Sequence, residues 1–279
     1  MRTGFEISSG EGLPIRGVLE VPPQPRCVVV IVHGFKGFKD WGFFPWISER
    51  LTAAGIATIR FDMSRSGIGG RPGELDRLDL FADDTYATEV ADLAAVLAWS
   101  RGIDRFHGLP RFLLGHSRGG GVAVLAAARE AVGIRGLVTW SSIARADRWS
   151  AEEKKAWRAS SRLEVVNART GQRMPLSTRI LDEVERGEPA LDIAAAMASL
   201  PCPTLTIHGF ADESVPVSEA RELARHARNG SLVLIENAGH TFGAQHPMDG
   251  VPPELSFAMH ATIGFLGAYC RQTRIVTRD

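Results

Sequence analysis

Six short runs of apolar, mostly β-branched residues recur along the chain, and segments with helical periodicity lie between most of them. A run that is apolar at every position is typical of a strand covered on both faces, as in the middle of a parallel sheet. Strands that alternate with helices predict an α/β fold with a doubly wound, mostly parallel sheet. The runs span residues 27–32, 56–61, 112–115, 136–140, 204–208 and 232–235.

The N-terminal residues add two strands to this pattern. Residues 3–8 and 15–21 predict an antiparallel hairpin around the turn SSGEG, and the prolines that follow end it because proline has no N–H to donate. The sheet is therefore expected to hold about eight strands. Helices are expected at 84–101, where acidic residues near the start suit a helix N-terminus, and at 122–129, 217–228 and 254–270.

One interval, residues 143–200, interrupts the alternation. Its pattern predicts a helix at 151–160, a small hairpin at 163–176 with its tip at 167–171, and helices at 178–186 and 190–200. Long insertions in compact domains are usually functional. We therefore expect a lid, or cap, over a site on a core formed by residues 1–142 and 201–279. The alternative is a peripheral decoration of the sheet.

Composition narrows the class of protein. The chain has 32 basic and 32 acidic residues, so nucleic acid and anionic membranes are not expected as partners. Neither a signal peptide nor a membrane-spanning run is apparent. The three cysteines, Cys27, Cys202 and Cys270, lie far apart and form no CxxC pair. We therefore expect a reduced, cytoplasmic protein without a disulfide scaffold or zinc site.

The motif G-x-S-x-G occurs at residues 115–119, directly after an apolar run and directly before a helical pattern. In that context a serine lies on a sharp strand-to-helix turn, with its hydroxyl exposed above the sheet. Glycines at 115 and 119 allow the close backbone approach that this turn requires. The motif therefore predicts Ser117 as a nucleophile. The alternative is a glycine-rich turn that only packs a helix on the sheet.

A serine nucleophile needs a base, and the base needs a carboxylate that orients it. His240 follows the last apolar run, and Asp212 follows the run before it. Both positions are loops at the carboxyl ends of strands, where ligands bind in such sheets. We therefore expect a catalytic triad of Ser117, Asp212 and His240. Less favoured alternatives are His246 as the base, and Asp147 or Glu213 as the acid.

Acyl transfer also needs hydrogen-bond donors for the oxyanion. The expected oxyanion hole consists of the backbone N–H of Arg118, after the nucleophile, and that of Phe35, after an early strand. Neither role constrains the side chain. Aromatic residues could line a pocket for an apolar or aromatic acyl group, although packing of the lid on the core would explain them equally. The candidates are Trp41, Phe44, Trp140 and Trp149.

The segments HGFKG, GHSRGG, HGFADESVP and NAGHTFG occur in the order found in the α/β-hydrolase superfamily, which the chain resembles outside residues 143–200. It is most similar to cinnamoyl (feruloyl) esterases, dienelactone-hydrolase-like proteins and S33-type aminopeptidases. Dienelactone hydrolases proper use a cysteine nucleophile, whereas this chain has Ser117. The resemblance implies a serine hydrolase without metal or organic cofactor.

The expected function is hydrolysis of a small-molecule carboxylic ester through an acyl-enzyme. Amide, peptide or thioester hydrolysis by the same triad is the first alternative, because the leaving group is selected by the pocket. A non-catalytic binding protein of the same fold is the second, since a fold does not fix a function. The oligomeric state stays open, with a homodimer as one option.

Overall fold

The computed structural model describes residues 1–71, 73–129, 133–167, 170–187 and 189–270. Its main sheet has eight strands in the order β1-β2-β4-β3-β5-β6-β9-β10. The pairs β1–β2 and β2–β4 are antiparallel, and all other neighbours are parallel, which confirms the predicted α/β fold. The strands are β1 (Arg2–Ser8), β2 (Pro14–Glu20), β3 (Val28–Val32), β4 (Ala57–Phe61), β5 (Arg111–His116), β6 (Ile134–Trp140), β9 (Thr204–Gly209) and β10 (Gly230–Ile235).

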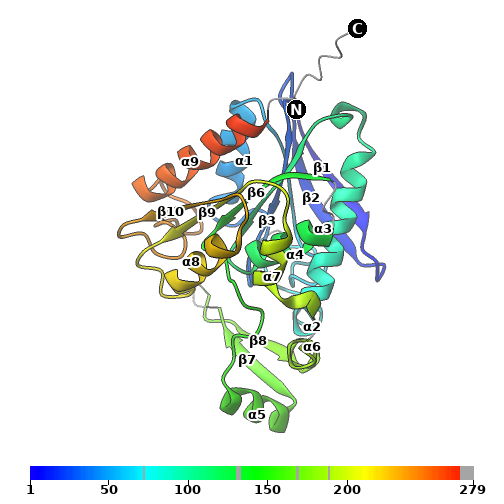
Figure 1. The fold of residues 1–279 in the computed structure, drawn as a ribbon. Coiled ribbons are helices and arrows are strands. Elements are labelled where there is room, and N and C mark those ends of the chain that lie inside the picture. Colours follow the sequence, from blue (N-terminus) through cyan, green and yellow to red (C-terminus); the bar gives the residue numbers. More distant parts are fainter. Residues whose placement is uncertain (72, 130–132, 168–169, 188, 271–279) are drawn as a thin grey trace.

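Helices cover both faces of the sheet (Figure 1), and the sheet separates two apolar cores, one on each face. On one face lie α1 (Phe44–Ala53) and α9 (Pro253–Tyr269). On the other lie α3 (Tyr86–Arg101), α4 (Arg118–Arg129) and α8 (Val217–His226). Two short helical elements lie between these: α2 (Leu78–Ala82) precedes α3, and η1 (Asp104–Phe106) follows it. Neither α1 nor α2 was expected from the sequence, since the segment before α1 was considered only as a source of pocket aromatics.

Helix α4 begins at Arg118, four residues before the predicted start. The sequence pattern understated it because three consecutive glycines have poor helix propensity. The space around them explains why they are glycines. A Cβ on Gly119 would lie 2.2 Å from the carbonyl oxygen of His33, and one on Gly120 would lie 2.3 Å from Ser142 Oγ. The helix therefore starts where no side chain fits between it and its neighbours.

The insertion folds into the predicted elements and divides into two halves. Helix α5 (Ala151–Ser160) and the antiparallel strands β7 (Arg162–Val166) and β8 (Arg173–Ser177) project away from the sheet (Figure 1). Helix α6 (Arg179–Glu185), η2 (Pro189–Leu191) and α7 (Ile193–Ser199) belong to the second half, in which α7 packs against α4. Residues 168–169 of the predicted hairpin tip lie outside the described residues.

The cysteines differ from the sequence-based expectation. Cys27, just before β3, and Cys270, just after α9, form a disulfide across 243 residues of sequence, and buried Cys202 is free. Separation along the chain gave no indication that the fold brings the two ends of this loop together. The expectation that all cysteines are reduced is therefore wrong for this pair. The cysteines thus give no support to a cytoplasmic location. None of the described helices combines the length and apolar character needed to cross a bilayer.

This disulfide makes a simple chemical prediction. Unfolding in guanidinium chloride without reductant should expose one titratable thiol per chain, that of Cys202, and three after reduction. Cys270→Ser should lower the free energy of unfolding by about 2–4 kcal/mol, because the unfolded chain loses its cross-link. The double variant with Cys27→Ser should cost no more than this. Three thiols before reduction would contradict the pairing.

Two acidic residues of α3, Glu89 and Asp92, are buried. Asp92 accepts a hydrogen bond from the backbone N–H of Ser64 at 2.7 Å. Burial raises the pKa of Asp92 to about 6, even though that hydrogen bond favours the charged form. Because the folded pKa exceeds the ordinary value of 3.8, the stability held by protonated Asp92 is complete below about pH 4. It is lost as the pH rises through 6.

Asp92→Asn should therefore stabilise the protein selectively at higher pH. Relative to the wild type, its free energy of unfolding should be more favourable at pH 8 than at pH 4 by about 2–3 kcal/mol, from about 1.4 kcal/mol per pKa unit. Urea unfolding at both pH values measures the difference. Asp104→Asn, at an exposed position in η1, is the matched control and should give no such difference. Parallel behaviour of the two variants would refute the prediction.

Candidate active site

Ser117 lies on the sharp turn between β5 and α4. Its φ of 56° is in the left-handed region, which costs a non-glycine residue roughly 1–2 kcal/mol. Two backbone hydrogen bonds hold the turn: Ser117 N–H donates to the Trp140 carbonyl at 2.9 Å, and Gly120 N–H donates to the Ser117 carbonyl at 2.9 Å. A strained residue fixed in this way at a strand end is typical of functional sites.

The fold brings Ser117, His240 and Asp212 into one hydrogen-bonded chain. His240 Nε2 lies 3.0 Å from Ser117 Oγ, and His240 Nδ1 lies 2.8 Å from Asp212 Oδ2. The other carboxylate oxygen of Asp212 accepts the backbone N–H groups of Ser214 and Val215, each at 2.9 Å. These distances suit a base that takes the serine proton while a carboxylate holds its ring.

Asp212 carries its charge at neutral pH. Burial alone would raise the pKa of this carboxyl, but the hydrogen bonds from His240, Val215 and Ser214 outweigh it, so the pKa lies below its ordinary value. An ionised Asp212 accepts a hydrogen bond from His240 Nδ1–H, which keeps the proton on Nδ1 and leaves Nε2 free to accept the proton of Ser117. The arrangement therefore fixes the tautomer that a general base requires.

The alternative base and acids, His246, Asp147 and Glu213, do not join this hydrogen-bonded chain. His246 accepts a hydrogen bond from Gly42 N–H at 2.9 Å, and its ring packs on the edge of Phe38. Asp147 pairs with Lys154 of α5, and Glu213 is exposed. The geometry thus favours His240 and Asp212 over these alternatives.

Two further histidines, His116 and His208, contact the hydrogen-bonded chain of Ser117, His240 and Asp212. His116 Nε2 lies 3.0 Å from the His240 carbonyl, and burial lowers the pKa of His116 to about 3, so the ring is neutral and donates from Nε2. His208 Nε2 donates to the Val215 carbonyl at 2.8 Å and lies 3.3 Å from Asp212 Oδ2. No local sequence pattern indicated that His116 bonds to the main chain of His240.

The loop after β3 passes directly against the nucleophile. A Cβ on Gly34 would lie 2.9 Å from Ser117 Cβ, so only glycine fits there. His33 holds this loop, since its Nδ1 lies 2.9 Å from the Gly34 carbonyl and its Nε2 accepts Met63 N–H at 3.2 Å. The N–H of Phe35 follows in this loop, while that of Arg118 belongs to the first turn of α4, whose N–H groups have no acceptor within the helix.

The Arg118 side chain links these two segments. Its guanidinium is buried, lies 2.8 Å from Glu89 and 3.1 Å from Asp84, and contacts the rings of Tyr86 and Phe35 with centroid distances of 4.4 and 5.4 Å. A cation packed on an aromatic face is attracted by the ring. Sequence reasoning left both side chains unconstrained, because it considered only their backbone N–H groups.

Arg118 also balances two buried acids. Burial raises the pKa of Asp84 and Glu89, and the charge of Arg118 opposes that rise. The acidic residues near the start of the predicted helix 84–101 were the only sequence signal for this cluster. Their partner could not be identified from the sequence, because Arg118 lies beyond the end of α3 and reaches them only in the folded chain.

Arg118→Met should therefore destabilise the fold strongly. Removing one partner from a buried ion pair costs about 3–5 kcal/mol, because the remaining charges stay buried and unpaired. Urea unfolding should show this loss at pH 7 and a smaller one at pH 5, where the acids with raised pKa take up protons more readily. Arg129→Met, at the exposed end of the same helix, is the control. Equal losses in the two variants would contradict the assignment.

Two hollows flank Ser117 and His240. One, of about 280 Å³, is lined on its apolar side by Trp41 and Phe44 and also by Asn167 from the insertion. The other, of about 290 Å³, is lined by Tyr86, Ile143, Arg148 and Trp149, among others. Three of the four predicted pocket aromatics thus line a hollow.

Trp140 does not line either hollow, and that prediction is wrong. It is fully buried beneath the site, where its indole N–H donates to Thr262 of α9 at 3.0 Å. Its neighbours Ser141 and Ser142 suggested a loop at the strand end, but the side chain of the last strand residue faces the α9 core. Alternation along a strand decides this direction, and one residue of register separates a pocket wall from a core residue.

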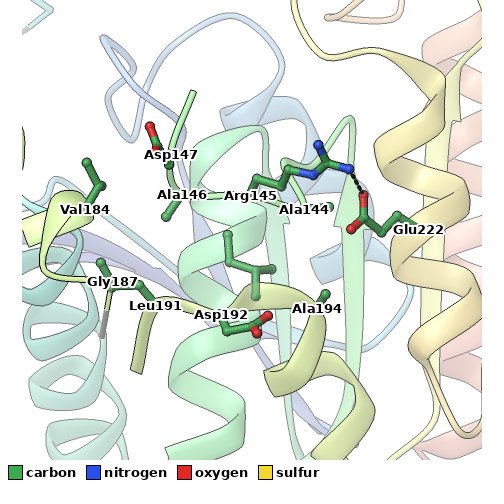
Figure 2. Close-up of a pocket in the computed structure, with 11 residues that line it drawn as sticks. Ala144, Arg145, Ala146, Asp147, Val184, Gly187, Leu191, Asp192, Ala194 and Glu222 are labelled. Carbon is green, nitrogen blue, oxygen red and sulfur yellow. Dashed lines mark hydrogen bonds and ion pairs between the residues drawn. The ribbon is translucent and has the colours of Figure 1, made fainter. Parts of the chain in front are cut away.

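Figure 2 shows a separate hollow of about 330 Å³ between the first residues of the insertion and α7. Leu191 and Val184 contribute to its apolar lining, and the ion pair of Arg145 with Glu222, at 3.0 Å, lies at its edge. It shares no lining residue with the hollows around Ser117. In the described part of the chain, no group of three or more His, Cys, Asp or Glu side chains could hold a metal ion.

The sheet, the strand-end loops and the serine turn define an α/β-hydrolase fold, and the chain is a member of that class. More particularly, it belongs to the family described as serine aminopeptidase, S33, whose model matches residues 23–185, more than half of the chain.

Individual relatives are more distant. The 2,6-dihydropseudooxynicotine hydrolase of Paenarthrobacter nicotinovorans is 27% identical over 216 residues, which cover 75% of this chain and 50% of that protein. Two Mycobacterium tuberculosis proteins named as phosphoribosyl transferases are 32% identical over 127 residues, 46% of this chain and 27% of theirs. The chain therefore matches about a quarter of the length of the two Mycobacterium tuberculosis proteins and half of the length of the Paenarthrobacter nicotinovorans hydrolase. Among solved structures, ferulic-acid-bound Est1E from Butyrivibrio proteoclasticus has a TM-score of 0.77 at 23% identity and covers 95% and 98% of the two chains.

Proposed function

We propose that this hydrolase cleaves a carboxylic ester through an acyl-enzyme intermediate. The observation that carries the proposal is the unbroken hydrogen-bond chain from Asp212 through His240 to Ser117, beside two hollows large enough for a small substrate. A serine hydroxyl is a weak nucleophile on its own, and such a chain is what activates it.

In the first half of the reaction, Ser117 Oγ attacks the ester carbonyl carbon while His240 Nε2 takes the hydroxyl proton. Asp212 stabilises the imidazolium that forms. The N–H groups of Phe35 and Arg118 bind the negative oxygen of the tetrahedral intermediate. When the intermediate collapses, the bond to the leaving alcohol breaks and His240 gives its proton to that alcohol.

In the second half, water attacks the acyl group on Ser117 and His240 takes the proton of the water. The second tetrahedral intermediate collapses when His240 returns a proton to Ser117 Oγ. The acid product leaves and the free enzyme is restored. The same residues act in both halves because deacylation repeats acylation with water in place of the alcohol.

The lining of the hollows favours esters over peptides with a free amino terminus. None of the described lining residues is a carboxylate that could bind an α-ammonium group, whereas Trp41 and Phe44 offer apolar surface. A monkeypox virus protein named as a monoglyceride lipase homolog, 26% identical over 240 residues, is in keeping with ester chemistry. Amide and thioester hydrolysis would use the same triad, so leaving-group preference is the point that turnover assays must decide.

We further propose that residues 143–200 act as a lid over this site. Asn167 lines the hollow beside Ser117, and Lys36 Nζ donates to the Val166 carbonyl at 3.1 Å. Gln172 adds a second link by donating to the Leu75 carbonyl at 2.9 Å. The hairpin thus borders the entrance, where a lid would control access of substrate and water.

Labelling with a small fluorophosphonate tests the activated nucleophile. The wild type should form one adduct on Ser117, located by intact mass and peptide mapping, and should hydrolyse 4-nitrophenyl esters. Ser117→Ala should abolish labelling and turnover, and His240→Ala should lower both by a factor on the order of 10³ or more, because the hydroxyl keeps its proton. Circular dichroism should show folded variants. A folded wild type without an adduct, or turnover by Ser117→Ala, would overturn the proposal.

A further inference from the structure

Lys36 occupies a central position in the site without a role in the proposed reaction. It follows Phe35 in the loop after β3 and lines both hollows that flank Ser117. Its side chain is half-buried, and Nζ donates one hydrogen bond, to the Val166 carbonyl at 3.1 Å. Nζ also lies over the ring of Phe35, 5.7 Å from its centroid, which is near the outer limit for attraction of a cation by a ring. An ammonium group has three donors. Among the described residues, the other two therefore have no hydrogen-bond acceptor.

The neighbouring cations each pair with a carboxylate of the protein, whereas Lys36 does not. The other cations that line the hollows, Arg118 and Arg148, pair with buried or half-buried acids, and Arg148 lies 2.6 Å from Glu219. Lys39, in the same loop, lies 2.9 Å from Asp62 and 3.1 Å from Asp40. Among the described residues, no carboxylate lies within 4.0 Å of Lys36 Nζ.

This imbalance is costly in the absence of a ligand. A half-buried ammonium loses part of its hydration, and without an anion it recovers little of that loss. Burial accordingly lowers the pKa of Lys36. Taken together, the linings of the two hollows contain three lysine or arginine side chains and, within the described residues, no carboxylate. An anionic ligand would remove the imbalance.

The backbone gives an independent indication. Gly37 N–H donates to the Gly34 carbonyl at 2.9 Å, which closes a tight turn with Lys36 at its third position. Lys36 has a φ of 59°, a conformation that glycine or asparagine adopts most easily at this position of a turn. A lysine thus stands where local preference favours a smaller residue. Strain at a site-lining residue points to a role for its side chain.

We propose that the ester substrate carries a second, anionic group, a carboxylate, which Lys36 Nζ binds beside the reacting ester while the apolar part lies against Trp41 and Phe44. A single carboxylate matches the one unbalanced ammonium in charge. This inference names the substrate class of the proposed esterase and therefore rests on that function. Lys36 is a specificity residue in this scheme and takes no part in bond making.

Matched pairs of esters test the proposal. The pairs are 4-nitrophenyl hydrogen adipate with 4-nitrophenyl hexanoate, and the hydrogen suberate with the octanoate, which differ within a pair only by a terminal carboxylate in place of a methyl group. The ratio of kcat/KM for the anionic to the neutral ester is measured for the wild type and variants. Lys36→Met should lower this ratio about tenfold or more, as expected for loss of one charge-assisted hydrogen bond.

Two further variants separate charge from structure. Lys36→Arg keeps the cation and should keep the ratio within about threefold of the wild type. Lys155→Met removes a lysine from the exposed surface of α5 and should change kcat/KM for neither member of a pair. If Lys36→Met slows both members of a pair equally, Lys36 only holds the hairpin through Val166, and the carboxylate proposal is wrong.

The same assays keep the two proposals apart. Turnover of the hexanoate with a ratio that does not depend on Lys36 would leave the esterase function intact and remove the anion site. Absence of turnover for all four esters, together with no fluorophosphonate adduct on Ser117, would overturn the esterase function and with it the inference that rests on it. A Lys36-dependent ratio would support both.

Discussion

The site depends on the close approach of two backbone segments, the loop after β3 and the turn from β5 into α4. Glycines at 34, 115 and 119 leave no room for a side chain between them, since a Cβ on Gly119 would lie 2.2 Å from the His33 carbonyl oxygen. This contact places Gly34, the residue before Phe35, directly against the side chain of Ser117. Close packing of backbone against backbone cannot relax the way a flexible side chain can. The position of Ser117 is therefore set by the sheet and its strand-end loops.

Charge inside the protein reinforces this contact. The guanidinium of Arg118 joins α4 to the start of α3 through Glu89 and Asp84, and it contacts the ring of Phe35 on the neighbouring loop. On the other side of Ser117, N–H groups of the loop after β9 hold Asp212, and His116 holds His240. Thus Ser117, His240 and Asp212 are each restrained by at least one neighbour outside their own hydrogen-bonded chain.

Local patterns in the sequence predicted the sheet, most helices and the three residues that the fold brings together. They succeeded because continuous apolar runs have few solutions, and because strand-end loops in a parallel sheet meet at one edge. The remaining features depend on contacts between distant segments. The partners of Arg118, the buried direction of Trp140 and the pairing of Cys27 with Cys270 are of this kind. No local pattern specifies which distant atoms meet.

The disulfide has a topological consequence for the whole molecule. It joins the residue before the central strand β3 to the residue after the last helix, so a covalent ring encloses the serine turn, the insertion and both remaining members of the hydrogen-bonded chain. A backbone cut anywhere inside that ring, for example in the projecting α5–β7–β8 unit, opens the ring without producing two molecules. The parts that carry Ser117 and His240 stay tethered, and each keeps the other at high local concentration.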